Sequence, residues 1–289
     1  MSNQLTGNRQ PGNIASYFGA YRRVLFPCLC ALFVFSAVFL LILHDTKPIS
    51  QVAESELVLE PEGGPLILSD LPDFNQITDI TQRKERFFSL IRPIVEEENS
   101  RISQQRHRLL ELMGQYNLNS FVTGEDLTWL YSLAKEYKVQ GFSPEYESSW
   151  NTLMVRVDII PVPLALVQAA IESAWGTSRL SLASNNIYGQ WCFSAGLGIV
   201  PARRDSGATH EIARYPSINQ SVRSYLLNLN THAAYGTLRR LRQEQRLASN
   251  KLDSYALAGG LVQYSERRGE YVKEIRSMLR YNQQLLVSV

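Results

Sequence analysis

The sequence contains few of the residues from which disulfide frameworks and metal centres are built. Its 289 residues include only three cysteines and four histidines. Cys28 and Cys30 lie in an apolar segment near the start, and Cys192 stands alone in the rest of the chain. No disulfide bond is therefore predicted after the apolar segment. Cys192 lies between two aromatic residues, so we expect it to be a small buried hydrophobic side chain.

Motifs that would identify several other enzyme classes are also missing. His210 and Glu211 begin the helical zinc-protease pattern, but Arg214 stands where the second histidine would be. The other histidines show no ligand spacing, and neither a glycine-rich phosphate loop nor a Gly-x-Ser-x-Gly motif occurs. The sequence therefore predicts no bound metal and no organic cofactor.

Charge is nearly balanced overall, with a formal net value of +2, but it is unevenly distributed along the chain. Residues 44–100 carry five basic and twelve acidic side chains, whereas residues 151–289 carry sixteen basic and nine acidic ones. A basic domain favours an anionic partner, and an anionic glycan, a membrane surface and a nucleic acid all qualify on charge alone. The hydrophobic content of 45% suits a folded core, so a wholly disordered chain is excluded.

Residues 24–43 form an apolar run of twenty residues without a charge. As a helix this run would span about 30 Å, the thickness of the hydrocarbon core of a bilayer. A cleaved signal peptide is the alternative, but its apolar region is usually shorter and no Ala-x-Ala type site precedes His44. Because Arg22 and Arg23 precede the run, we expect an uncleaved inner-membrane anchor with a cytoplasmic N-terminus and an exported remainder. This topology argues against a nucleic-acid partner.

The most informative carboxyl group belongs to Glu172, in the segment Val167-Gln-Ala-Ala-Ile-Glu-Ser-Ala-Trp-Gly176. The glycine predicts that a helix ends just after Glu172. Burial against apolar neighbours and the negative end of the helix dipole both disfavour the ionised form. The expected neighbours are Ala169, Ile171 and Trp175. The pattern predicts an acid that stays protonated near neutral pH, as a general acid must, and the alternative is a solvent-exposed glutamate on a helix surface.

Several segments downstream of Glu172 occur in the same order as the motifs of a known family. They are Asn185-Asn-Ile-Tyr-Gly-Gln-Trp-Cys-Phe193, Pro201-Ala-Arg-Arg204, His210-Glu211, Tyr215-Pro-Ser217 and Ser224-Tyr-Leu-Leu-Asn-Leu-Asn230. Together with Glu172-Ser-Ala-Trp-Gly-Thr-Ser-Arg179, they resemble the bacterial Bax family, which has no connection with the apoptosis protein of that name. They are similar, more loosely, to the wider endo-β-N-acetylglucosaminidase family that includes flagellum-associated peptidoglycan hydrolases. The resemblance extends from Ile80 to Asn282.

The resemblance implies a lysozyme-like α+β fold with a cleft between two lobes, and a glycosidase in which Glu172 is the catalytic acid. It implies peptidoglycan glycan strands as the substrate. Five positions correspond to recurrent residues of the family and are candidate substrate-binding residues: Asn186, Tyr188, Trp191, Tyr225 and Tyr235. Aromatic rings offer flat apolar faces to a sugar, and an asparagine amide can bond an N-acetyl carbonyl. Alternatively, Tyr188 and Tyr225 are core residues and Asn186 holds a turn.

Most glycosidases place a second carboxylate opposite the acid. Glu211 is the only glutamate in the loop-rich stretch after Glu172, and Asp205 is the only aspartate there, so both are candidates, with Glu211 preferred. Each is alternatively a surface carboxylate paired with a nearby arginine. The N-acetyl group of the substrate, or a tyrosine that positions water, can also replace a second carboxylate.

Composition and periodicity divide the chain into five parts. Residues 1–23 are predicted to be a cytoplasmic tail, 24–43 the anchor, 44–80 an acidic tether, 81–150 a helical accessory region and 151–284 the catalytic domain. Helices are predicted over residues 81–116, 123–138, 146–156, 218–231, 237–247, 253–260 and 270–282, and over a segment that begins near Pro163 and ends at Glu172.

Details within these parts are also predicted. Pro93 is placed to bend or divide the first helix, and residues 185–207 suggest loops with a short β-hairpin. Tyr235 and Arg239 match the family as cleft-wall or structural positions, whereas the basic tract 239–246 is predicted to be a solvated helix face. The overall prediction is a mostly helical domain with a small β or irregular lobe.

Three functions agree with these observations. The first is a membrane-anchored β-N-acetylglucosaminidase-like hydrolase of peptidoglycan. A lytic transglycosylase on the same fold is the second, and a non-catalytic cell-wall-binding protein of the envelope is the third.

Overall fold

The structure, a computed structural model, describes residues 67–192, 196, 198–200 and 210–288. These residues all belong to one compact unit of the chain, Gly63–Val289. The predicted cytoplasmic tail, membrane anchor and first part of the tether lie outside the described residues, as does Asp205. Within the described ranges, no helix is both long enough and apolar enough to cross a membrane.

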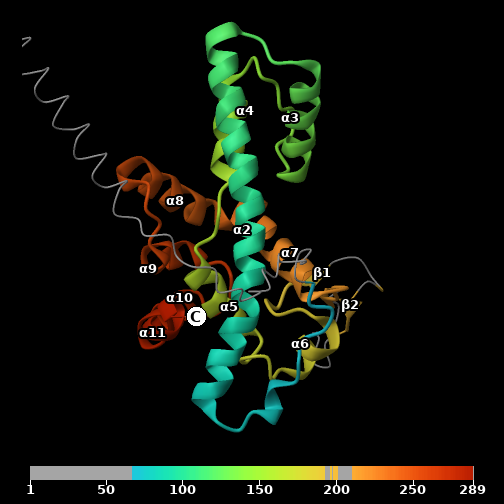
Figure 1. Cartoon of the computed structure of the whole chain (residues 1–289), viewed down its shortest axis with the longest axis vertical. Helices are drawn as coiled ribbons and strands as arrows, with labels where there is room; N and C mark the ends of the chain where they lie inside the picture. The colour runs from blue at the N-terminus through green and yellow to red at the C-terminus, as the bar shows by residue number, and fades with distance from the viewer. Residues whose placement is uncertain (1–66, 193–195, 197, 201–209, 289) are drawn as a thin grey trace, which may run out of the picture. The chain divides into compact units, whose positions relative to one another are not determined.

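The longest element is α2, Ile80–Asn119, which begins at Asp79, whose side chain accepts a hydrogen bond from the Gln82 amide. Pro93 was expected to bend or divide this segment, and it does not divide it, because α2 continues through residue 93 as one helix. Apolar residues recur along α2 at helical spacing and enter two separate cores, one at each end of the helix. The helix therefore connects two packed regions (Figure 1).

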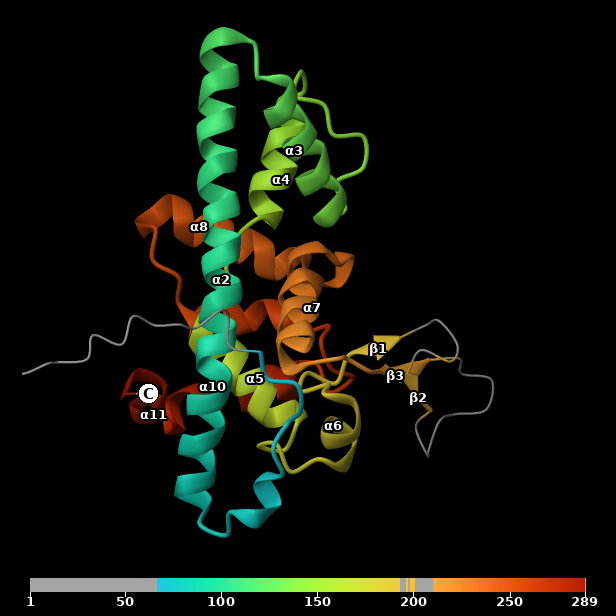
Figure 2. The same cartoon turned by 45° about the vertical axis from the view of Figure 1, so that its right-hand side comes forward.

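The C-terminal half of α2 packs with α3, Gly124–Glu136, and α4, Glu147–Arg156, into a helical arm (Figures 1 and 2). Thr123 caps α3 by accepting a hydrogen bond from the Asp126 amide. The buried residues of the arm are Leu109, Leu112, Val122, Leu130, Leu133, Ala134, Tyr137, Phe142, Trp150, Leu153 and Val157. The arm's core thus extends past the predicted boundary at residue 150.

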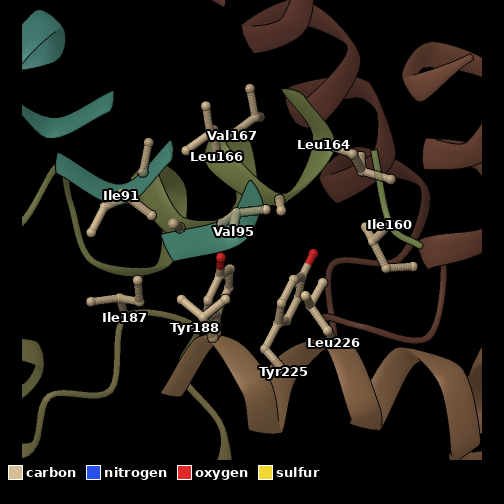
Figure 3. Packing of buried hydrophobic residues seen from close by; sticks show 14 of the residues in the cluster. Ile91, Val95, Ile160, Leu164, Leu166, Val167, Ile187, Tyr188, Tyr225 and Leu226 are labelled. Atoms are coloured by element: carbon tan, nitrogen blue, oxygen red, sulfur yellow. The ribbon is translucent and has the colours of Figure 1, made fainter. Parts of the chain in front are cut away.

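The main core surrounds α5, Val162–Glu172, which is apolar on nearly all sides and almost wholly buried. The N-terminal half of α2 packs on one side of α5, and α10, Gly269–Tyr281, packs on another. Figure 3 shows Leu166 and Val167 of α5 near Ile91 and Val95 of α2, and Leu164 near Ile160. Further helical elements are α7, Ile218–Thr231; η2, Ala233–Tyr235; α8, Gly236–Ser249; α9, Ser254–Leu257; η3, Ala258–Leu261; and α11, Gln283–Ser288.

Two short helices were not predicted. One is α6, Arg179–Ser184, which Ser178 caps, and the other is α11. Both have only six residues, which is too short for a helical hydrophobic period to stand out in the sequence. Ser178, a residue type favoured just before the first turn of a helix, was the available signal for α6.

The described residues contain one small sheet, with strand order β1-β3-β2. Its strands are β1, Trp191–Cys192; β2, Gly198–Ile199; and β3, Glu211–Ala213. A hairpin was predicted within residues 185–207, but β1 and β2 do not pair with each other, because β3 lies between them and pairs antiparallel with both. In Figure 2 the strands lie beside α6 and α7. The prediction of a mostly helical domain with a small β lobe is confirmed, although Cys192 is partly exposed instead of buried.

The last part of the predicted tether packs against the main core. Leu71 and Phe74 are buried there, and η1, Phe74–Gln76, is a single helical turn. The Leu71 amide donates to Asn185 Oδ1 at 3.1 Å, and Asn185 Nδ2 donates to the Ser69 carbonyl at 2.7 Å. The acidic composition of residues 44–80 concealed these apolar anchors, so the prediction of a tether is wrong for the described residues 67–79.

A buried charge cluster joins the arm to the main body. The carboxylate of Asp158, where the chain leaves the arm, lies 2.8 Å from Arg246 Nη2 of α8 and 3.7 Å from Arg106 Nη1 of α2. Burial by itself would raise the pKa of Asp158, but the Arg246 hydrogen bond and the charges of Arg242 and Arg106 hold it below its usual range. Asp158 is therefore ionised at neutral pH.

Arg242 lies at the centre of this cluster with only 1% of its surface exposed. Its guanidinium donates to Asn230 Oδ1 and to the backbone carbonyls of Val155, Asp158 and Ile159. Burial lowers the pKa of Arg242 to about 10, so it stays charged at neutral pH. The prediction of a solvated face for residues 239–246 is wrong here, because these hydrogen bonds compensate the charge for its loss of water.

Candidate active site

Glu172 is the last residue of α5, and a tight left-handed turn follows it. Ala174, Trp175 and Gly176 all have positive φ angles, of 49°, 59° and 76°. The buried Ser173 hydroxyl holds this turn, since it donates to the Ala169 carbonyl and accepts from the Gly176 amide. The predicted end of the helix at this glycine is confirmed, and the turn leaves the Glu172 side chain at the C-terminal end of α5.

The residues of the turn pack against elements that precede α5. A Cβ atom on Gly176 would lie 2.4 Å from the ring of Phe74, so only glycine fits there. The ring of Trp175 packs against Phe88 and Phe87 of α2, with ring centroids 5.0 and 5.9 Å away. Trp175 was expected beside the Glu172 carboxyl, but its described ring contacts anchor the turn to α2.

The two carboxyl oxygens of Glu172 have different surroundings. Oε1 accepts a 2.6 Å hydrogen bond from the hydroxyl of Tyr271 on α10. Oε2 faces Gly189, where a Cβ atom would lie 3.1 Å from it. The side chain as a whole is neither fully buried nor fully exposed. The carboxyl is thus held on one oxygen, and a residue without a side chain leaves space beside the other.

The pKa of Glu172 is raised above its ordinary value, and burial is the main cause. The hydrogen bond from Tyr271 and the positive charge of Arg267 oppose the rise, whereas the negative charge of Glu274 adds to it. The direction is the one that the sequence predicted. Burial raises the pKa of Tyr271 above its ordinary value of 10, and the negative charge of the neighbouring Glu172 raises it further. Tyr271 therefore stays neutral and can donate a hydrogen bond.

Tyrosines surround the site, and their rings are packed in order. Tyr188 lies parallel to Tyr225, with ring centroids 3.6 Å apart, and Tyr264 lies parallel to Tyr271 at 5.5 Å. Tyr225 and Tyr235 each contact the ring of Tyr264. In Figure 3 the hydroxyls of Tyr188 and Tyr225 both point toward α5. The cluster gives the acid a largely apolar wall with hydroxyl groups at defined positions.

Hydrogen bonds connect this wall to the acid through Gln168. The Tyr225 hydroxyl donates to Gln168 Oε1 at 2.6 Å, and Gln168 Nε2 donates to the Tyr271 hydroxyl at 3.1 Å. Tyr271 then donates to Glu172. The Tyr264 hydroxyl donates separately to the backbone carbonyl of Tyr188 at 2.8 Å.

Gln168, Tyr264 and Tyr271 were not predicted as site residues from the sequence. A signal existed for Gln168, because it precedes Glu172 by four residues and so lies on the same face of the helix. Tyr271 shares the apolar face of α10 with Ile275, also four residues away, and was indistinguishable from a core residue.

Some of the predicted substrate-binding residues lie in the core, and one lies at the surface. Tyr188 and Tyr225 are buried in the stack, and Tyr188 has a buried hydroxyl with no hydrogen-bond partner among the described residues. Tyr235 is also buried, near enough for the charge of Glu172 to raise its pKa, although burial is the larger cause. Trp191 on β1 is 52% exposed and stacks on His210 at 4.1 Å. Of these four, Trp191 offers the most accessible ring.

Asn186 holds the turn that carries Gly189. Its Nδ2 donates to the carbonyls of Gln190 and Ala213 at 2.8 and 3.0 Å, and its Oδ1 accepts from the Gln190 amide at 3.0 Å. The side chain is almost completely buried. Its amide hydrogens are thus directed to the backbone, which corresponds to the structural alternative that the sequence left open.

Glu211, the preferred second carboxylate, is buried on β3. Its oxygens accept hydrogen bonds from the amides of Gly196 and Gly198 at 2.9–3.1 Å. A Cβ atom on Gly198 would lie 2.4 Å from the Ile212 carbonyl, so the strands are close together here. Glu211 therefore links β3 to Gly196 and Gly198, and a catalytic role for it stays a prediction.

Two surface hollows lie away from Glu172. One follows the N-terminal half of α2, and the other lies at the base of the arm near Thr231. Their lining residues are Gln82, Glu85, Arg86, Ser89 and Leu90 for the first, and Lys138, Val139, Gln140, Gly141, Tyr146, Ser148, Ser149, Thr152, Arg156 and Thr231 for the second. The chemistry at Glu172, and not the size of a hollow, identifies the candidate site.

Replacing Gly189 with alanine is expected to lower activity by about tenfold to a hundredfold, because the new methyl group would displace the Glu172 carboxyl. Gly141→Ala is the matched control, since Gly141 has the same φ of +63° but nothing within 4 Å of its Cβ position. Both variants carry the strain of a left-handed alanine, and only Gly189→Ala touches the acid. Equal activity of the two purified proteins would show that the space beside Oε2 is not needed.

Comparison with known proteins gives the class of this molecule. Residues 147–284 match the glucosaminidase family, described as mannosyl-glycoprotein endo-beta-N-acetylglucosaminidase. The matched region contains Gln168, Glu172, Tyr264 and Tyr271. The protein is therefore a glycosidase, as the sequence analysis predicted.

One curated relative shows the family more closely. The chain is 32% identical over 222 residues to protein Bax of Escherichia coli (strain K12), covering 76% of this chain and 77% of the relative. The chain belongs to the bacterial Bax family. No solved structure matches it.

Proposed function

We propose that this protein is a β-N-acetylglucosaminidase-like hydrolase that cleaves peptidoglycan glycan strands, with Glu172 as its general acid. The observation that carries the proposal is the environment of that carboxyl. Its pKa is raised mainly by burial, one oxygen is held by Tyr271, and the other faces a glycine. A carboxylic acid with a raised pKa keeps its proton to higher pH than an ordinary glutamate, and can protonate the oxygen that leaves when a glycosidic bond breaks.

The opposite side of the reaction needs a nucleophile or an activated water molecule. Glu211 is the carboxylate suggested by the sequence, but its oxygens hold the amides of Gly196 and Gly198. We therefore favour participation of the substrate's own N-acetyl group, which would attack the anomeric carbon as the bond to the leaving sugar breaks. Substrate assistance of this kind makes a second protein carboxylate unnecessary.

Two features support a polymeric glycan of the cell wall as the substrate. Trp191 on the small sheet presents a half-exposed ring suited to the apolar face of a sugar. The excess of basic residues after residue 150 suits a polymer that carries carboxylates. Neither feature favours an asparagine-linked mannose chain.

The proposed location follows from the charge pattern of the first residues. We propose that residues 24–43 anchor the chain in the inner membrane and that the catalytic domain acts outside the cytoplasm. The acidic tether would then let the domain reach the wall while it stays attached.

Product analysis on purified peptidoglycan sacculi tests the proposed activity. We expect mass spectrometry to find new reducing-end N-acetylglucosamine after incubation with the full chain. Anhydro-muramic ends would instead show a lytic transglycosylase. Binding to sacculi without any released product would show the non-catalytic wall-binding protein.

A further inference from the structure

Gln168 is a fully buried amide whose two ends both make hydrogen bonds. It lies one turn before Glu172 on α5, and its partners come from α7 and α10. An amide oxygen only accepts hydrogen bonds and an amide nitrogen only donates them. The directions of both hydrogen bonds are therefore set. The Tyr225 hydroxyl donates to Oε1, and Nε2 donates to the Tyr271 hydroxyl.

These directions determine what Tyr271 can do. Its hydroxyl oxygen receives the Gln168 hydrogen, so its own hydrogen must go to a different acceptor. Within the described residues, the acceptor at hydrogen-bonding distance is Glu172 Oε1, 2.6 Å away. Tyr271 is buried, so leaving this hydrogen without an acceptor would be unfavourable. Oε1 of Glu172 is thus occupied as an acceptor.

Oε1 of Glu172 already accepts the Tyr271 hydrogen bond, so a carboxyl proton bonded to Oε1 would compete with the Tyr271 hydrogen for the same side of that oxygen. When Glu172 is protonated, its proton belongs on Oε2. That oxygen faces Gly189, the residue without a side chain. The proton would then lie on the oxygen beside which Gly189 places no side chain, and a glycosidic oxygen would have to approach from there.

We propose that Gln168 is a positioning residue: by donating to Tyr271 it directs the Tyr271 hydroxyl onto Oε1 of Glu172, and so keeps the catalytic proton on Oε2. Gln168 acts only through Tyr271 and does not itself touch the substrate. The inference rests on the proposed role of Glu172 as the general acid.

The same chain of hydrogen bonds affects the pKa of Glu172. Burial raises that pKa, and the hydrogen bond from Tyr271 opposes the rise because it stabilises the ionised form. If Tyr271 is no longer directed toward Oε1, part of this opposition is lost and the pKa rises further. Since a general acid works only while protonated, the high-pH limb of the activity profile then moves to higher pH.

The test is Gln168→Met in the full chain, because methionine keeps the approximate length of the side chain and removes both hydrogen bonds. We expect kcat to fall by about three- to tenfold with KM changed less than about twofold. We also expect the high-pH limb to move up by about half to one pH unit. The titration of the Glu172 carboxyl, followed by ¹³C NMR and assigned by its loss in Glu172→Gln, should move in the same direction.

Two variants define the scale of the effect. Tyr271→Phe removes the donor outright, so its Glu172 titration should move up at least as far as that of Gln168→Met. Tyr137→Phe is the matched control, because it removes a partly buried tyrosine-to-glutamine hydrogen bond of 2.8 Å, to Gln105, inside the arm. That variant should lose comparable stability in a thermal melt and keep the wild-type pH profile.

The inference is overturned if the Glu172 titration is the same in Gln168→Met as in the wild type, or if Tyr137→Phe shifts it equally. The NMR titration needs no substrate, so it tests the positioning role independently of activity. Failure to release any glycan product would instead overturn the proposed function, and the two failures are distinguishable.

Discussion

Replacing Glu172 with glutamine is expected to lower the rate of glycan cleavage by about 10²–10⁴-fold. Glutamine keeps the shape of the side chain but has no acidic proton to donate to the leaving oxygen. The amide oxygen can still accept the hydrogen bond from Tyr271, so the packing at the end of α5 should survive. The loss should appear in kcat, measured by release of reducing ends from sacculi and by clearing in a zymogram.

Stability provides an independent check on this variant. A carboxyl whose folded pKa is raised binds its proton more tightly in the folded protein, so its ionisation destabilises the fold as pH rises above the unfolded value of 4.5. Glutamine does not ionise. At pH 7 the melting temperature of Glu172→Gln should therefore equal or exceed that of the wild type.

The matched control is Glu244→Gln, which changes an exposed carboxyl on α8 that pairs with Arg240. Its activity should stay at the wild-type level. If Glu172→Gln clears sacculi as well as this control does, Glu172 has no part in the reaction.

Replacing Arg242 with alanine is expected to lower the free energy of unfolding by about 3–5 kcal/mol, the largest stability effect that we predict. The change removes the buried cation beside Asp158 and leaves Asn230 and several backbone carbonyls without their donor. These groups join the base of the arm to α7 and α8, so the loss is one of both charge balance and hydrogen bonding.

Arg240→Ala is the control for this prediction, since Arg240 lies on the same helix two residues away. Its ion pair with Glu244 is exposed, with relative side-chain accessibilities of 60% and 56%. The free energy of unfolding should change by no more than about 0.5 kcal/mol. Urea denaturation of both variants measures the difference, and equal midpoints would show that the buried cluster adds no net stability.

Local pattern predicted much of the fold. The helical spacing of apolar residues placed α2, α3, α4, α7, α8 and α10 close to their observed bounds. The pattern was insufficient for α6 and α11, which are too short to carry a period. It was also insufficient for the small sheet, because β3 pairs with strands that precede it by a long connection.

Two charged segments show most clearly that composition alone does not predict which residues are buried. The tract 239–246 is basic, and composition alone predicts that such a tract faces water. Arg242 is nevertheless buried, because Asp158, 84 residues earlier, supplies backbone and side-chain oxygens to it. Residues 67–79 were assigned to an acidic tether for the same reason, although Leu71 and Phe74 enter the main core.

By itself, the sequence determined the family, the mainly helical fold and the position of Glu172 just before a left-handed turn that needs glycine. These properties depend on neighbouring residues and on the order of motifs. Only the tertiary structure decided what surrounds the carboxyl. Tyr271 lies 99 residues after Glu172 and reaches it because α10 packs against α5, and Gln168 directs that contact. Hydrogen bonds between such distant residues depend on how the helices pack, which no local pattern encodes.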